Sequence, residues 1–153
     1  MRKGRRISSL FASSALVAGA IVGGSASPVS AHDYYQAIRA GCDWWDSHFK
    51  ILESKVINNP AGAWMGNVYL VWNGPTGQNC VVTVQEAGHG IPAKLVAKLG
   101  IRSSGSGAIT YRTDSGYYGH FAAVKEYTSG QCVNYRGEIA GSVAGRTEWG
   151  NCG

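Results

Sequence analysis

The chain has 153 residues, with 14 basic and 9 acidic side chains and a formal net charge of +5. Arg2, Lys3, Arg5 and Arg6 all lie within the first six positions, and without them the net charge is +1. The remaining basic residues form no stripe along the sequence, so the charge gives no reason to expect nucleic acid or an anionic membrane as a partner.

Residues 1–31 have the three-part layout of a secretory signal peptide. A basic start is followed by the small, apolar segment 7–24, and Val29 and Ala31 occupy the −3 and −1 positions that a signal peptidase reads. A transmembrane anchor is the alternative, but serine and glycine interrupt the apolar segment and a cleavage-type sequence follows it. We expect cleavage after Ala31, with Ala26 as second choice, and one extracellular domain over 32–153.

The four cysteines indicate two disulfides. An even number of widely spaced cysteines is typical of proteins in an oxidising environment. A metal site is the alternative, but the sequence has no Cys-x-x-Cys pair and no closely spaced histidine pair, so we expect none. Of the three pairings, we favour Cys42–Cys152, which ties the ends of the domain, and Cys80–Cys132, which joins two strand starts.

The first part of the domain changes from weakly helical to strand-like. Segment 32–41 has some helical character but is too short to be stable alone, so 32–48 is a candidate loose N-terminal arm. Strands are predicted over 49–57, 67–73 and 79–85. The last two are joined by a reverse turn at 74–77, where Pro75 and Gly77 supply the turn conformations. Segment 67–73 is apolar on both faces, which predicts a central strand with Trp72 buried.

The rest of the chain also alternates with a period of two. Leu95, Leu99 and Ile101 alternate with Lys94 and Lys98, which favours a half-exposed strand over a helix at 92–99. Further strands are predicted over 108–112, 118–127, 132–139 and 146–149, with turns at 102–107, 114–116 and 128–130. About eight short strands without βαβ alternation predict an all-β fold, an antiparallel β-sandwich or small barrel.

The sequence assigns no catalytic residue and no cofactor. Ser115 follows Asp114, but there is no Gly-x-Ser-x-Gly motif, and 114–116 is typical of a turn. The spacing of the acidic residues establishes no glycosidase pair. His89 lies between two glycines; an exposed ligand is one interpretation, and a mobile loop histidine is the ordinary one. We expect a non-catalytic protein, with a small hydrolase as the alternative.

Aromatic residues are the better functional lead. All five tryptophans and all eight tyrosines lie beyond residue 31. Trp44 and Trp45 follow Cys42 closely and are flanked by Asp43 and Asp46, a composition that suits sugar rings or a protein surface. Core packing is the alternative. In extended backbone one of the two would point inward and the other outward, so the pair is a candidate binding platform.

Three segments carry a family resemblance: GNVYLVWNGPTGQNCVVTV (66–84), TDSGYYGHFAAV (113–124) and GQCVNYRG (130–137). In this order and with the four cysteines in register, they resemble the spore-associated protein A family of small exported actinomycete proteins. Residues 135–137 depart from the Trp-Gly-Gly-like sequence expected there, and 32–65 and 86–107 match poorly. The resemblance implies an extracellular protein found with spores or aerial hyphae, with no established enzymatic activity and no catalytic residues to carry over.

From the resemblance and the aromatic residues together, we expect as partner a protein or glycan of the cell wall or spore surface. A protease inhibitor or toxin-like domain is a further alternative, because small exported domains with two disulfides include such proteins.

Overall fold

The fold is taken from a computed structural model, which describes residues 33–46 and 48–153. The predicted signal peptide, 1–31, lies outside these residues. Among them, no helix is long and apolar enough to span a membrane.

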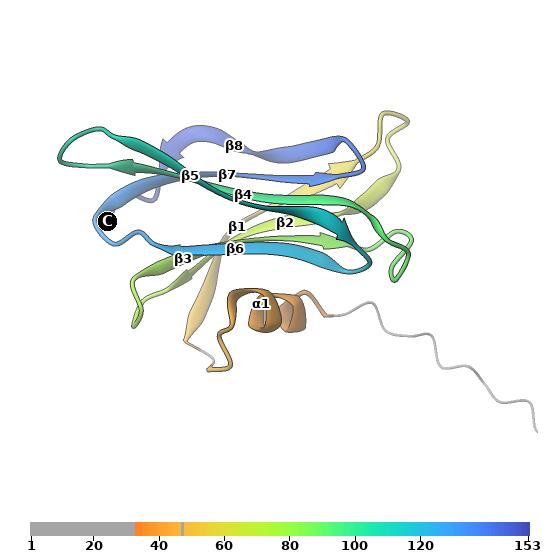
Figure 1. The fold of residues 1–153 in the computed structure, drawn as a ribbon, viewed down its shortest axis with the longest axis horizontal. Coiled ribbons are helices and arrows are strands. Elements are labelled where there is room, and N and C mark those ends of the chain that lie inside the picture. Colours follow the sequence, from red (N-terminus) through yellow and green to blue (C-terminus); the bar gives the residue numbers. More distant parts are fainter. Residues whose placement is uncertain (1–32, 47) are drawn as a thin grey trace, which may run out of the picture.

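In the described part of the chain, eight strands form two four-stranded antiparallel sheets packed face to face (Figure 1). We call the sheets the first and second sheet. In spatial order, the first contains β1 (Phe49–Asn58), β2 (Trp64–Asn73), β3 (Gln78–Gln85) and β6 (Phe121–Tyr127). The second contains β5 (Ile109–Tyr118), β4 (Ala93–Ser103), β7 (Gln131–Ile139) and β8 (Ser142–Gly150). The predicted all-β sandwich is confirmed.

The core between the sheets is built from alternate residues of the inner strands. Leu95, Leu99 and Ile101 of β4 are buried against Val68 and Val81 of the first sheet. Alternation with polar residues therefore places one face of β4 in the core and the other on the outside. The strand predicted here in preference to a helix is confirmed.

A short helix, α1 (Tyr34–Cys42), covers the outer face of the first sheet beside β3 and β6 (Figure 1). The side chain of Asp33 caps it by accepting a hydrogen bond of 3.2 Å from the N–H of Tyr35. Ala37 and Ile38 are buried against Val82 and the rest of that face. The alternative of a loose arm over 32–48 is wrong for the helical part, because β3 is apolar on both faces and its outer face requires a cover.

The two disulfides are Cys42–Cys80 and Cys132–Cys152, so the favoured pairing was wrong. Cys80 faces α1 on the outer side of the first sheet, next to the residue that ends the helix. Cys132 lies near the start of β7 in the second sheet, so it cannot reach Cys80. Because β8 runs antiparallel to β7, the chain returns toward the start of β7 and brings Cys152 to Cys132.

The turn predicted at 114–116 was also wrong, because these residues lie inside β5. The side chain of Asp114 accepts hydrogen bonds from the hydroxyl of Tyr118 at 2.7 Å and from the N–H of Ala123 at 3.0 Å. The carboxylate of Asp114 therefore joins β5 to β6 and does not form a turn. The connection between these two strands comes later, at Gly119 and His120.

Both long sides of the sandwich are bridged by an arginine–glutamate pair. Arg112 on β5 contacts Glu126 on β6 at 2.6 Å, and this hydrogen bond holds the pKa of Glu126 below its usual value. On the other side, Arg146 on β8 pairs with Glu53 on β1.

The register of β1 against β2 shifts twice, between Ile51 and Glu53 and between Ile57 and Asn58.

Candidate functional site: the exposed face of the second sheet

The predicted platform of Trp44 and Trp45 is divided by the fold. Trp44 is only 4 % exposed and its indole N–H donates to the side-chain oxygen of Gln78 at 3.2 Å, whereas Trp45 is 71 % exposed. One ring thus points inward and the other outward, but both follow the end of α1 and neither lies in the strand that the expectation assumed. Trp45 borders a hollow of about 350 Å³ along α1, next to Arg39. A platform of two adjacent rings is therefore not formed.

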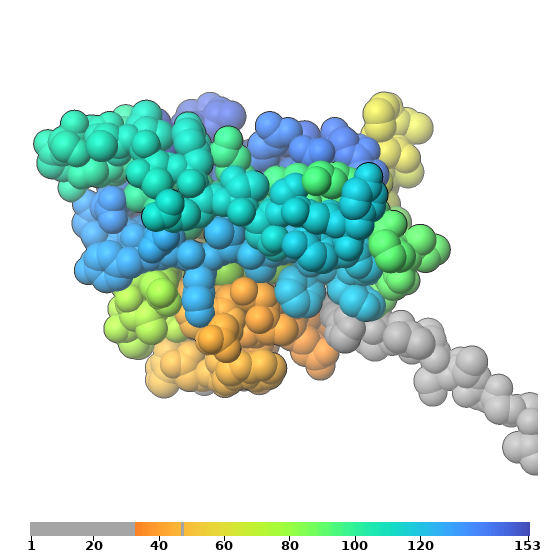
Figure 2. All heavy atoms as spheres, viewed as in Figure 1, coloured from red at the N-terminus to blue at the C-terminus, as the bar shows by residue number. Residues whose placement is uncertain are grey.

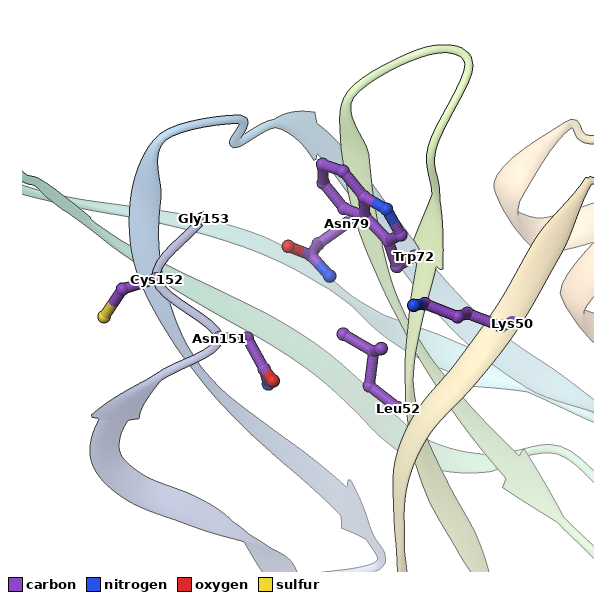
Figure 3. Close-up of a pocket in the computed structure, with 7 residues that line it drawn as sticks. All are labelled: Lys50, Leu52, Trp72, Asn79, Asn151, Cys152 and Gly153. Carbon is purple, nitrogen blue, oxygen red and sulfur yellow. The ribbon is translucent and has the colours of Figure 1, made fainter.

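Trp72, predicted to be buried, is instead half-buried near the end of β2. It borders a hollow of about 260 Å³, where Trp72 and Lys50 lie on one side and the last residues of the chain on the other (Figure 3). The amide of Asn79 is used internally, since it donates to the carbonyl of Val71 and accepts from the hydroxyl of Thr128. This hollow thus offers one ring and one cation. Its lining consists of Lys50, Leu52, Trp72, Asn79, Asn151, Cys152 and Gly153.

The outer face of the second sheet carries a group of aromatic and basic side chains. In the space-filling view, β5 lies on the side of the molecule opposite α1 (Figure 2). Since Leu95, Leu99 and Ile101 point into the core, the alternate residues of β4 point outward. These outward residues include Lys94, Lys98 and Arg102, and no helix of residues 33–46 or 48–153 covers them.

Each of these three cations lies over an aromatic ring. The Lys98 ammonium is 4.2 Å from the centre of the Tyr111 ring, and the Lys94 ammonium is 5.9 Å from the Tyr117 ring. The Arg102 guanidinium lies 5.3 Å from the Trp149 ring, which comes from β8. Such pairs contribute on the order of 0.5–1 kcal/mol each at exposed positions, so they hold the long side chains down on the face.

Two of the three rings stay accessible despite these contacts, and Trp149 is half-buried. Tyr111 is 50 % exposed and Tyr117 is 76 % exposed. Successive cations on β4 are four residues apart, a spacing of about 13 Å along an extended strand. The three pairs therefore cover a flat strip about 26 Å long from Lys94 to Arg102.

Gly100 makes this strip continuous. A Cβ at Gly100 would lie 2.0 Å from the side-chain oxygen of Asn134 and 2.9 Å from the Tyr111 ring. The missing side chain therefore lets Tyr111 and Asn134 approach each other across β4. Both border a shallow hollow of about 190 Å³, together with Lys98 and Arg136.

The charge of this face is strongly one-sided. Lys94, Lys98, Arg102 and Arg136 all point outward, and the acidic Glu138 beside them is paired with Arg136 at 3.0 Å. We expected no basic stripe from the sequence, although three of these cations come from β4 and only the fourth comes from β7. The spacing of Lys94, Lys98 and Arg102 on the polar side of β4 was the signal that could have revealed it.

The acidic residues Asp114 and Asp46, both named in the sequence, each have a partner of their own. Ser115 is exposed, while Asp114 is bonded to Tyr118 and raises the pKa of that phenol through the hydrogen bond. His48 contacts Asp46 at 3.3 Å on the surface. In the described part of the chain, no three His, Cys, Asp or Glu side chains are grouped closely enough to hold a metal ion.

These features define a small β-sandwich held by two disulfides, with one covered and one bare outer face. The disulfides indicate an extracellular or surface location. The chain is 39 % identical over 101 residues to "Spore-associated protein A" of Streptomyces coelicolor, which covers 65 % of this chain and 61 % of the relative. The alignment thus spans less than two thirds of the relative, and it confirms the predicted resemblance to the spore-associated protein A family.

No family model matches the sequence, and no solved structure matches the chain.

Proposed function

We propose that the chain is a secreted, non-catalytic protein of the spore or hyphal surface that binds an anionic envelope glycan through the outer face of its second sheet. The name of the similar protein supports the association with spores, and the two disulfides support a place outside the cell. The observation that carries the ligand class is the row of three cation–aromatic pairs at Lys94, Lys98 and Arg102.

The chemistry of the face matches a charged polysaccharide. Aromatic rings pack against the apolar faces of sugars, while lysine and arginine attract carboxylate or phosphate groups on the same polymer. A strip about 26 Å long suits an extended chain better than a compact small molecule. The hollow at Trp72 is a weaker candidate, because it combines one ring with one cation.

The proposal is tested by affinity electrophoresis and calorimetry with two soluble probes, polygalacturonate and neutral dextran. We expect binding to polygalacturonate only, and the affinity falls as salt rises because the exposed cations are screened. Binding to purified spore walls is then measured before and after hydrofluoric acid removes phosphodiester-linked polymers, which separates phosphate from carboxylate as the anionic group.

Two double variants and one control assign the face. Y111A/Y117A removes the exposed rings, and K94Q/K98Q removes two cations while keeping long side chains. We expect each to weaken binding at least tenfold, and K94Q/K98Q also to flatten the salt dependence. W45A alters the exposed tryptophan on the α1 side and leaves binding unchanged. If only W45A loses binding, the glycan site lies in the hollow along α1 and not on the second sheet.

A further inference from the structure

A second feature, on the loops at one end of the sandwich, is a pair of histidines in direct contact. Nε2 of His89 and Nδ1 of His120 are 3.0 Å apart, and the ring centres are separated by 4.4 Å. His89 belongs to the connection between β3 and β4, and His120 to the connection between β5 and β6. The two residues are 31 positions apart in the sequence.

The loop that carries His89 is held by the side chain of a buried residue, Gln85. Gln85 is only 3 % exposed, and its side-chain NH₂ lies within hydrogen-bond distance of three loop carbonyls. These belong to Ala87 at 3.2 Å, Gly88 at 2.8 Å and Ile91 at 3.1 Å. A buried amide thus fixes the path of the backbone on both sides of His89.

The His120 loop is also bonded to the His89 loop and to the last residue of β3. The N–H of Gly90 donates to the carbonyl of Gly119 at 2.7 Å, and the N–H of Gln85 donates to the carbonyl of His120 at 2.8 Å. A Cβ at Gly119 would lie 3.0 Å from the carbonyl oxygen of Gly90, so glycine permits this close approach. The backbones that carry the two rings are therefore positioned before any ligand arrives.

We propose that His89 and His120 form a two-imidazole binding site for a divalent copper ion. With metal–nitrogen distances of about 2.0–2.1 Å, two nitrogens 3.0 Å apart subtend an angle of about 91–97° at the ion, close to the right angle between neighbouring ligands in a square-planar Cu²⁺ site. The ion takes the place of the proton now shared between the rings. The ring that donates this proton carries it on its other nitrogen instead, so both imidazoles stay neutral.

The surroundings leave room for the remaining ligands. His120 borders an open hollow of about 420 Å³, lined also by Asp114, Tyr117 and Tyr118. Water or a small anion can complete the coordination from this side. Copper binds imidazole more tightly than nickel or zinc in a site of given geometry, so we expect the order Cu²⁺ > Ni²⁺ and Cu²⁺ > Zn²⁺.

The test uses the tag-free extracellular protein and CuCl₂ in a non-coordinating buffer, followed by calorimetry and electron paramagnetic resonance. We expect one Cu²⁺ bound per chain at this site, with nitrogen hyperfine coupling from two imidazoles. H89A and H120A should each weaken binding at least tenfold and remove one imidazole from the spectrum. H48A, which removes the surface histidine beside Asp46, is the matched control and should bind copper like the wild type.

Two-dimensional amide spectra of each variant establish that it is folded before titration. A folded H89A/H120A double variant with wild-type copper affinity and an unchanged spectrum would overturn the proposal. An equal loss in H48A would do the same, because the site would then not be specific to the loop pair. Neither outcome bears on glycan binding by the second sheet.

Discussion

The hydroxyl of Thr83 donates a hydrogen bond of 2.7 Å to the backbone carbonyl of Val96 and so joins the two sheets across their interface. Thr83 is fully buried. Gly137 lies beside it, where a Cβ would come within 2.6 Å of the Thr83 hydroxyl and 2.5 Å of the Val68 side chain. The sheets therefore approach closely at this point, and a polar group inside the core has its partner in the opposite sheet.

Replacing this hydroxyl tests how much the contact between sheets stabilises the fold. T83V keeps the volume and removes the donor, so we expect the free energy of unfolding to fall by roughly 1–2 kcal/mol. T113V, on exposed β5, should change stability by less than about 0.5 kcal/mol. Urea denaturation measures both, and equal stabilities for T83V and wild type would show that the bond contributes nothing.

The two disulfides should contribute unequally. Cys42–Cys80 closes a loop of 38 residues and Cys132–Cys152 one of 20, which corresponds to about 4 and about 3 kcal/mol in the chain-entropy view. We expect C42A/C80A to be the less stable double variant in guanidinium unfolding. It should also shift tryptophan fluorescence to longer wavelength, because Trp44 loses its cover when α1 detaches. A larger loss in C132A/C152A would contradict this.

Tyr135 makes stability depend on alkaline pH. Burial, followed by the charge and hydrogen bond of Glu53, raises the pKa of Tyr135 to about 12. The unfolded phenol titrates near 10. Because the folded pKa is the higher one, the contribution of Tyr135 is constant below pH 10 and is lost as the pH rises from 10 through 12.

Denaturation series between pH 8 and pH 12 check this, with phenolate absorbance followed in parallel. Y135F should decline less steeply above pH 10 than the wild type. E53Q removes the negative charge beside the phenol, so it should lower the pKa of Tyr135. If the highest tyrosine pKa is the same in E53Q as in the wild type, Glu53 does not raise the pKa of Tyr135.

Gly100 provides a test of the exposed face that leaves every ring and cation in place. In G100A the new Cβ collides with Asn134 and Tyr111, so both must move. We expect roughly 1–3 kcal/mol lower stability and severalfold weaker binding of polygalacturonate. G105A is the matched control, since nothing lies within 4 Å of a Cβ there. Thermal unfolding and calorimetry distinguish the two.

Local patterns in the sequence were sufficient for much of the sandwich. The β2–β3 hairpin followed from two apolar strands around Pro75 and Gly77, and β4 from its strict alternation. The cysteine pairing did not follow, because it depends on which sheet each strand joins, and sequence spacing carries no information on that.

The site was harder to predict than the fold for the same reason. Trp44 and Trp45 were predicted to act together because they are neighbours in the chain, yet only Trp44 is buried. The sequence predicted a turn at 114–116, directly before Tyr117. In the structure these residues continue β5, and the side chain of Asp114 bonds to β6. The partners of Lys94 and Lys98 come from β5, so the row of rings and cations exists only after the strands pair.

The edge strands of the two sheets determine whether molecules of this protein can associate at high concentration. An exposed strand edge invites another chain to add to the sheet and can begin a fibril. Here β1 is irregular at two places, the Ala123 amide on β6 is occupied by Asp114, and charged Arg–Glu pairs lie along both sides. Growth by strand addition is therefore disfavoured, and densely packed molecules of this protein would remain separate folded units rather than form amyloid-like filaments.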